Sequence, residues 1–530
     1  MMKRTAVVYG VCILLLTAVM LRLCWIGWGE PLVQAGLHQS SFTLEAGRIR
    51  GGIYDCRLVP LVDCQSRTVT AVIPSQRALT LLEQAEGEDR DALLEQLGQG
   101  RPFLWQGELP AAPGVYRFEL GRRYTSESLA PHVIGYLDSA GKGVAGVEAA
   151  CGSLLEDYGW ACGVSCPVDA MGRALGGQAV AYGQETGRPG GVVLTLHAGV
   201  QQAAEEALAR YTHAGAAVVM EAATGRLLAV ASLPDFDPGN VAQALQQQDA
   251  PLVNRAFSAY NVGSLFKLAV AAAALEEGFL PTTVYECTGS VEVEGRLFHC
   301  HHRAGHGTVD LQEALEQSCN VYFIKLAQDV GAGPLRSMAL RLGFGSSSTL
   351  APGMTSAEGT LTAEADLQGG ELANFAFGQG RLTATPLQLA GMIAAIANGG
   401  LRVEPRLILG ATDHGTQLDA LAPAYSAAPV MAEQTAQILQ DMMVSVVTRG
   451  SGARAEPAVG GAGGKTASAQ TGSLDESGSE VVHAWFGGFY PAQNPRWSVV
   501  VLCEGGASGA QKAAPVFREI CGALAELPEF

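Results

Sequence analysis

Ser264 and Lys267 lie three residues apart at the start of the apolar run NVGSLFKLAV, in a chain where only six of the 34 basic residues are lysine. A lysine can lose its proton when it is buried, whereas an arginine stays charged. Residues i and i+3 share one face of a helix, so a neutral Lys267 amine could take the proton of the Ser264 hydroxyl. The pair therefore predicts a nucleophilic serine with a lysine base.

The local sequence favours a helix at this pair. Gly263 precedes the serine, the run LFKLAVAAAALEEG consists mainly of strong helix formers, and Gly278 is suited to end the helix. A second S-x-x-K match, Ser139–Lys142, lies in DSAGKGVAG, whose glycines disfavour a helix. The alternative at Ser264 is a helix-capping serine beside a surface lysine, and the helix alone does not exclude it.

Two later motifs carry polar groups that could face the same cleft. EQSCNVYF places Ser318 and Asn320 in a break between two helical runs. GGKTASAQTG places Lys465 and Thr466 at the start of an expected edge strand. An exposed strand edge can pair with an extended peptide, and a neighbouring lysine supplies charge for a terminal carboxylate.

The elements around these motifs predict an α+β domain over residues 191–530. VVLTL indicates a strand, GVQQAAEEALARYT an amphipathic helix, and AAVVMEAATGRLLAVAS two strands joined by a turn. A helix-rich middle over 263–399 is followed by a hairpin in 483–506 and a last helix over 511–527. Strands at both ends with helices between them predict an antiparallel sheet covered by helices.

Residues 30–190 are expected to form a separate mixed α/β region. It contains a β-like run at 68–73 and a helical stretch at 91–97, and the segment ETGRPGG at 185–191 has the composition of a domain boundary.

Residues 1–29 are expected to anchor the chain in the plasma membrane as a single-pass helix. Two basic residues precede an apolar run that is long enough to span a bilayer, with Trp25 and Trp28 at its interface. The basic residues place the N-terminus in the cytoplasm and the following domains outside. The alternative is a cleaved signal peptide with its site at 33–35, but the length of the run favours an anchor.

The net charge of the chain bears on its possible partners, and the spacing of its cysteines bears on possible disulfide bonds. The formal net charge of -17, without a basic patch, argues against nucleic acid as a partner. Irregular spacing of the twelve cysteines leaves disulfide connectivity open. Local pairs could form at Cys56/Cys64, Cys162/Cys166 and Cys287/Cys300.

The three motifs follow the order S-x-x-K, S-x-N and K-T-x, which is the active-site triplet of penicillin-binding proteins and serine β-lactamases. Their intervals and the segments around them also resemble those of penicillin-binding transpeptidases. RIRGGIYDCRLVPL at 48–61 and GVAGVE at 143–148 resemble parts of the class B pedestal (dimerisation-type) module, although Cys56 and Pro60 are unusual there. Over nearly its whole length the chain resembles a class B penicillin-binding protein of the division, elongation or spore type.

This resemblance implies a peptidoglycan D,D-transpeptidase that acts on stem peptides ending in D-Ala-D-Ala and is acylated by β-lactam antibiotics. By the same resemblance Ser264 is the acylated nucleophile, Lys267 its base, and Ser318 a proton relay, while Asn320 holds the amide backbone of the substrate.

The resemblance also assigns the strand that carries the third motif. Lys465 sets the local potential, Thr466 and Ser468 bind the terminal carboxylate, and the backbone N–H groups of Ser264 and Ser468 form the oxyanion hole. The residue after K-T is usually glycine in this family but is Ala467 here. We expect activity to be retained if its Cβ points away from the cleft.

The segment FHCHHRAGH at 298–306 raises the alternative of a zinc site with Cys287, whose ligands would come from His299, Cys300, His301, His302 and His306. Adjacent histidines lack an ordered ligand spacing, and the transpeptidase interpretation needs no metal. We therefore expect no metal and no cofactor, and a loop beside the cleft.

Other functions remain as alternatives. A β-lactamase would not normally need an anchor and a long pedestal, and a β-lactam sensor usually carries several spanning helices and an H-E-x-x-H motif. An inactive scaffold for cell-wall assembly is the non-enzyme alternative. Residues 30–190 are too few for a glycosyltransferase domain, so a separate membrane glycan polymerase is an expected partner.

Overall fold

The computed structural model describes residues 2–28, 41–75, 90–175, 179–184, 187–423, 427–474, 478–506 and 508–527. The chain divides into two compact units: unit 1 comprises Met1–Arg50, Gln65–Arg122 and Gly159–Gly187, and unit 2 comprises Gly51–Cys64, Arg123–Tyr158 and Arg188–Phe530. The cleavage site weighed at 33–35 and residues 185 and 186 of the expected boundary segment lie outside the described residues.

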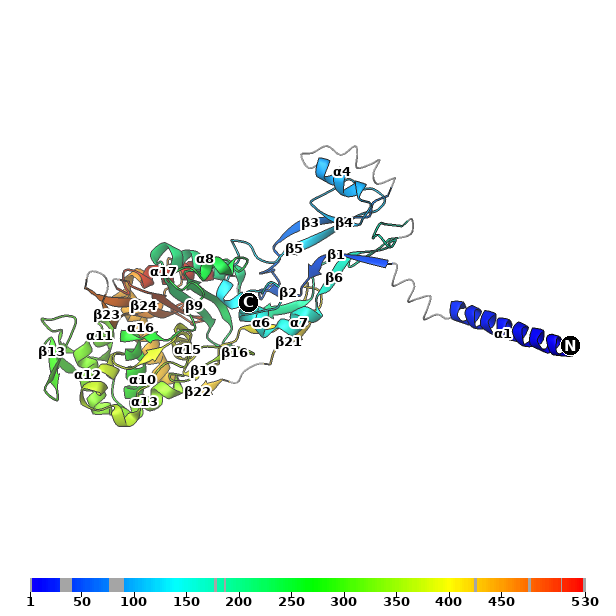
Figure 1. The fold of residues 1–530 in the computed structure, drawn as a ribbon. Coiled ribbons are helices and arrows are strands. Elements are labelled where there is room, and N and C mark those ends of the chain that lie inside the picture. Colours follow the sequence, from blue (N-terminus) through cyan, green and yellow to red (C-terminus); the bar gives the residue numbers. More distant parts are fainter. Residues whose placement is uncertain are drawn as a thin grey trace. The chain divides into compact units, whose positions relative to one another are not determined.

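A five-stranded antiparallel sheet forms the centre of unit 2, as the sequence predicts (Figure 1). Its spatial order is β10 (Leu227–Leu233), β9 (Gly215–Glu221), β25 (Trp497–Cys503), β24 (Glu480–Tyr490) and β23 (Gly463–Leu474). Strands from the beginning and the end of the unit thus pair, and β23 lies at an edge.

Helices cover both faces of this sheet because the side chains of its inner strands alternate between two apolar cores. In β25, Val499 and Val501 belong to the core under α8 (Ala198–Tyr211) and α17 (Ala513–Ala525). Val500 belongs to the larger core on the opposite face. That core contains α10 (Lys267–Glu276), which is buried up to Ala274, and the fully buried helix α15 (Pro386–Ala397).

The predicted helix-rich middle is present and contains the elements that carry the motifs. A 3₁₀ turn, η1 (Gly263–Phe266), precedes α10 and is followed by α11 (Leu311–Glu316), α12 (Asn320–Val330), α13 (Ala332–Arg341), α14 (Gly369–Ala376), α15 and later α16 (Glu433–Thr448). Between α10 and α11 the chain forms two small ribbons, β12 (Tyr285–Cys287) with β15 (Gly307–Val309) and β13 (Ser290–Val293) with β14 (Arg296–His299). These ribbons are not among the elements predicted from the sequence.

A second sheet of unit 2 has the order β2 (Gly52–Tyr54), β8 (Gly191–Leu194), β20 (Ile408–Thr412) and β21 (Ala420–Leu421). The remaining short elements of this unit are α5 (Pro131–Ile134), α6 (Gly146–Ala150), α7 (Gly152–Asp157), α9 (Val241–Ala244), β11 (Tyr260–Asn261), β16 (Thr349–Ala351), β17 (Met354–Thr355), η2 (Glu364–Asp366), β18 (Thr383–Ala384), β19 (Leu401–Arg402), β22 (Ala428–Pro429) and η3 (Ala453–Ala455).

The compact units do not follow the continuous range 30–190 expected for the pedestal. Residues 51–64 cluster with unit 2 because β2 pairs in parallel with β8. Arg123 joins residues 51–64 and 123–158 within the same unit, since its guanidinium donates to Asp63 at 2.7 Å and to the buried Glu148 at 2.7 Å. Because the chain passes between the two units several times, no single position in the sequence marks the boundary between them.

Unit 1 contains two three-stranded sheets with a shared apolar core. One has the order β1 (Ser41–Ile49), β6 (Trp160–Pro167), β7 (Val180–Tyr182), and the other β4 (Phe103–Gln106), β3 (Gln65–Val72), β5 (Val115–Arg122). Helix α4 (Arg90–Gly98) packs Leu93 and Leu97 near Val72. The predicted strand at 68–73 and helix at 91–97 are therefore confirmed.

Helix α1 (Met2–Trp28) contains the stretch Arg4–Ile26, which is long and apolar enough to cross a membrane. The same properties fit a signal sequence, so the helix supports either a single-pass anchor or a signal.

Candidate active site

Ser264 lies in the 3₁₀ turn η1, directly before α10, and is half-buried. Close packing around this turn requires glycine at two positions, Gly263 and Gly378. Gly263 has a φ of 63° and a Cβ there would lie 3.1 Å from the Cβ of Ala469 in β23, while a Cβ on Gly378 would lie 2.0 Å from the carbonyl oxygen of Gly263. These close approaches place Ser264 at the N-terminal end of a helix and beside the edge strand.

Lys267 occupies the first position of α10 and has no solvent exposure. A 3₁₀ turn has about three residues per turn, so Ser264 and Lys267 lie on one face. The Nζ atom donates hydrogen bonds to the carbonyl oxygen of Ser318 at 2.7 Å, to its Oγ at 3.2 Å and to Oδ1 of Asn320 at 2.7 Å. The first and second sequence motifs therefore meet at this amine.

Burial lowers the pKa of Lys267 from its ordinary value to about 7. Removing the ammonium from water disfavours its charged form, and the ring of Phe323, whose centroid lies 5.5 Å from Nζ, replaces only part of that solvation. Among the described residues, no hydrogen bond joins Ser264 Oγ to Lys267 Nζ; contacts of this kind are often long in unliganded enzymes and shorten when substrate binds.

The loop Ser318–Asn320 connects α11 to α12 in a constrained conformation. Ser318 has a φ of 54°, which is unusual for a residue with a side chain. Cys319 is the N-cap of α12, and its Sγ accepts from the backbone N–H of Tyr322 at 3.4 Å. The side chain of Asn320 makes two hydrogen bonds: Oδ1 accepts from Lys267 Nζ, and Nδ2 donates to the carbonyl oxygen of His299 at 3.3 Å.

Lys465 and Thr466 lie on the edge strand β23 and are both buried. Lys465 Nζ donates to the carbonyl oxygen of Thr466 at 3.0 Å, and the Thr466 hydroxyl lies 2.9 Å from that of Ser451. Burial, together with the charge of Lys267, holds the pKa of Lys465 well below its ordinary range. The charge of Lys267 thus makes Lys465 harder to protonate.

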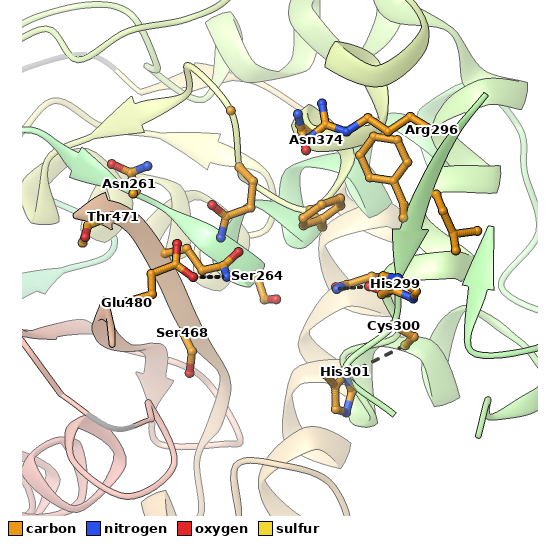
Figure 2. Close-up of a pocket in the computed structure, with 18 of the residues that line it drawn as sticks. Asn261, Ser264, Arg296, His299, Cys300, His301, Asn374, Ser468, Thr471 and Glu480 are labelled. Carbon is orange, nitrogen blue, oxygen red and sulfur yellow. Dashed lines mark hydrogen bonds between the residues drawn. The ribbon is translucent and has the colours of Figure 1, made fainter. Parts of the chain in front are cut away.

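The cleft in front of these motifs has a volume of about 710 Å³. Figure 2 shows Ser264 between the strand that carries Ser468 and the segment that carries His299 and His301. Of the predicted site residues, Ser264, Asn320 and Ser468 line the cleft. Lys267, Ser318, Lys465, Thr466 and Ala467 do not line it.

Several lining residues were not predicted as site residues: Asn261, Arg296, Leu297, Phe298, Arg303, Asn374, Phe377, Gln379, Gly380, Gln470, Thr471, Gly472 and Glu480. Thr471 follows the third motif on β23, so its proximity to that motif was the available signal. Asn374, on α14, had no such signal, because packing alone brings this helix to the cleft.

Ala467 is 3 % exposed and belongs to the apolar core rather than to the cleft lining. Its methyl group therefore takes no space that a ligand in the cleft would need. We expect Ala467→Gly to change the second-order rate constant of acylation by a fluorescent penicillin by less than about threefold, and to lower stability by about 1 kcal/mol through the flexibility of glycine. A gain of tenfold or more would show that the methyl group obstructs the ligand.

These features form a cleft with a half-buried serine at a helix N-terminus, a buried amine behind it and an edge strand beside it, an arrangement that suits serine acyl transfer. The model of the penicillin binding protein transpeptidase domain matches residues 215–522. The chain is 34% identical over 375 residues to the peptidoglycan D,D-transpeptidase PbpA of Mycolicibacterium smegmatis, an alignment that covers 64% of this chain and 73% of that protein. It is 29% identical over 561 residues to stage V sporulation protein D of Bacillus subtilis, with 98% and 84% covered.

Solved structures agree with these comparisons. The penicillin G acyl-enzyme complex of penicillin-binding protein A from Mycobacterium tuberculosis has a TM-score of 0.64 and 26% identity, with 79% of this chain and 96% of that chain covered. The chain belongs to the penicillin-binding transpeptidase family, in its class B branch.

Proposed function

We propose that this protein is a membrane-anchored peptidoglycan D,D-transpeptidase that cross-links stem peptides through a serine acyl-enzyme. The observation that carries the proposal is the Lys267 amine, which is fully buried, bonded to both polar residues of the S-x-N motif and one helical turn from Ser264. A structural helix cap would not require a buried amine at this place.

The amine supports the role of general base for Lys267. A pKa of about 7 leaves a large neutral fraction near neutral pH. A neutral amine has two N–H groups, which suit the carbonyl oxygen of Ser318 and Oδ1 of Asn320, both acceptors only. Its lone pair is then available to a hydroxyl, either that of Ser264 or that of Ser318.

In the proposed first half-reaction, Ser264 Oγ attacks the carbonyl carbon of the penultimate D-Ala and its proton passes to Lys267. The backbone N–H groups of Ser264 and Ser468 stabilise the tetrahedral oxyanion. When the peptide C–N bond breaks, the leaving D-Ala amine receives the proton through the Ser318 hydroxyl. An ester of Ser264 remains.

In the second half-reaction, an amine of another stem peptide attacks the ester carbonyl. Lys267 accepts a proton from this amine and passes it to Ser264 Oγ as the ester C–O bond breaks, so that a new peptide bond joins the two stem peptides and the serine hydroxyl is restored. Asn320 holds the donor amide. Before acylation, the edge of β23 pairs with the donor peptide while Thr466 and Ser468 bind its terminal carboxylate, near Lys465, and this carboxylate leaves with the released D-Ala.

The acylation rate should therefore rise with pH through an apparent pKa of about 7. Below this value Lys267 is mostly protonated and cannot accept the serine proton; above it the amine is neutral and the rate reaches a plateau. Stopped-flow acylation with a fluorescent penicillin between pH 5.5 and 9 measures this profile. A rate that is flat across this range would contradict a titrating lysine base.

The proposed location follows from α1 as an uncleaved single-pass anchor, with the N-terminus in the cytoplasm and both units outside. A membrane-bound glycan polymerase would supply the glycan strands. β-Lactams would acylate Ser264, a step supported by the penicillin G acyl-enzyme complex of penicillin-binding protein A from M. tuberculosis.

Product analysis tests the proposed activity. The purified full-length protein is incubated with a D-Ala-D-Ala stem peptide and an acceptor amine, and products are separated by mass spectrometry. A cross-linked dimer with release of one D-Ala is expected. Hydrolysis of the stem peptide without cross-linking would indicate a carboxypeptidase. A stable acyl-enzyme with penicillin but no turnover of the peptide would indicate a sensor. Absence of any acylation would indicate a scaffold.

A further inference from the structure

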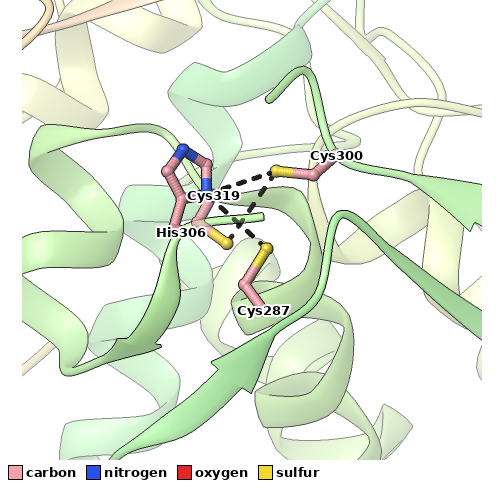
Figure 3. A group of neighbouring side chains, drawn as sticks. All are labelled: Cys287, Cys300, His306 and Cys319. Carbon is pink, nitrogen blue, oxygen red and sulfur yellow. Dashed lines mark hydrogen bonds between the residues drawn. The ribbon is translucent and has the colours of Figure 1, made fainter. Parts of the chain in front are cut away.

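Three cysteines and one histidine converge beside the active-site loop although they come from separate elements. Cys287 ends β12, Cys300 follows β14, His306 precedes β15, and Cys319 is the N-cap of α12. Figure 3 shows their side chains turned toward a common centre. Their ligand atoms all lie within 4.8 Å of one another.

The separations of these atoms match a tetrahedral zinc ion. With Zn–S bonds of about 2.3 Å and a Zn–N bond of about 2.0 Å, two sulfurs lie about 3.8 Å apart and a sulfur lies about 3.5 Å from the nitrogen. In the structure, Cys300 Sγ is 3.9 Å from Cys319 Sγ, and His306 Nδ1 is 3.5 Å from Cys300 Sγ and 3.6 Å from Cys287 Sγ.

The surroundings are those of a structural metal site. The three cysteines are 2 %, 1 % and 0 % exposed, and their set with one histidine is a known closed ligand set for structural zinc. The backbone folds tightly around them: Gly305 has a φ of 83°, and a Cβ there would lie 2.2 Å from the carbonyl oxygen of Cys287. Tyr322 N–H supports the sulfur of Cys319 from outside the set.

We propose that Cys287, Cys300, His306 and Cys319 bind one zinc ion that fixes the S-x-N loop of the active site. Binding would release the thiol protons and leave no open coordination position, so the ion would not take part in acyl transfer. Cys319 lies between Ser318 and Asn320. A bond from zinc to Cys319 would fix the residue before Asn320, and a bond to Cys300 would fix the residue after His299. Both partners of the hydrogen bond from Asn320 Nδ2 to the His299 carbonyl oxygen would therefore be held in place.

The proposed zinc site differs from the alternative that the sequence offers. The expectation of no metal rests on the adjacent histidines His301 and His302, which have no regular spacing, and Cys319 is not among the ligands that the sequence suggests. Of the four histidines in this segment, the converging set uses only His306, and its fourth ligand, the N-cap of α12, lies 13 positions further along the chain.

The test is the metal content of the full-length protein, purified in detergent without a histidine tag. We expect one zinc ion per chain, and three additional reactive thiols when a strong chelator removes it. Reduced protein that contains no zinc and does not take up added Zn²⁺ would overturn the proposal, as would a stoichiometric metal other than zinc. A Cys300–Cys319 disulfide, detected as two thiols recovered only by reductant, would do the same if the reduced protein fails to bind zinc.

Three variants localise the site. His306→Ala should lose zinc, His306→Cys should retain it because four thiolates also bind zinc tetrahedrally, and His302→Ala in the same loop should retain it. If His306→Ala fails to fold, the metal content of the unaltered protein and of His306→Cys still decides the proposal.

The positioning role of zinc rests on the proposed function and has its own measurement. Loss of zinc in His306→Ala should lower the acylation rate constant at least about tenfold with less change in penicillin affinity, and His306→Cys should restore it. Unchanged acylation without zinc would overturn the positioning role alone. Absence of acylation in the zinc-bound, unaltered protein would instead count against the proposed function.

Discussion

Ser264→Ala is expected to abolish covalent labelling by fluorescent penicillin, because no other hydroxyl in the cleft stands at a helix N-terminus one turn from a buried amine, as far as the described residues extend. Transpeptidation should fall by a factor on the order of 10⁶, the scale of losing a serine nucleophile. Intact-protein mass spectrometry after penicillin treatment measures the first effect, and dimer formation from stem peptides measures the second.

The chain contains a matched control for this variant. Ser139 belongs to the second S-x-x-K match but lies exposed in a turn with Lys142. Ser139→Ala should therefore label like the unaltered protein. Ser264 is only half-buried, and removal of its hydroxyl should change stability by less than about 1 kcal/mol. If Ser264→Ala remains labelled, the acylated residue lies elsewhere and the proposed mechanism is wrong.

The second large effect concerns Lys267. Lys267→Met should lower the acylation rate constant by about 10³-fold, within the range that general base catalysis contributes. Methionine fills a similar volume and removes a buried polar group, so the fold should persist. The plateau with an apparent pKa of about 7 should disappear together with the amine.

Lys267→Arg separates charge from proton transfer. Arginine keeps the positive charge near Ser318 and Asn320 but cannot be deprotonated, so it should be as inactive as methionine if the lysine acts as a base. Lys142→Met, at an exposed position, is the control and should acylate normally. Near-normal acylation in Lys267→Arg would show that the residue contributes only electrostatic stabilisation. Circular dichroism and thermal unfolding distinguish chemical loss from misfolding.

The three motifs of the proposed active site and their order were visible in the sequence because each motif is short and local. Ser264 and Lys267 lie within one helical turn, and Ser318 and Asn320 lie two residues apart. The strands of the central sheet could also be predicted. The sequence of β25 is a nearly continuous apolar run, which is typical of a strand buried on both faces. This pattern depends only on neighbouring residues.

The boundaries of the compact units were less accessible. The pairing of β2 with β8 joins residues more than 130 positions apart, and Arg123 joins two further segments through ionic contacts. No pattern within either segment indicates its partner, because pairing across such a distance depends on how the whole unit packs.

Local sequence thus determined which residues could be nucleophile, base and carboxylate-binding strand, and which stretches form helices and strands, since helical and strand periodicity arise from contacts between near neighbours. Only the tertiary structure decided that the Lys267 amine meets Ser318 and Asn320, that burial brings its pKa to about 7, and that Cys319 joins Cys287, Cys300 and His306. Proximity and desolvation are properties of the packed chain, because both require elements distant in the sequence to exclude water from the same place.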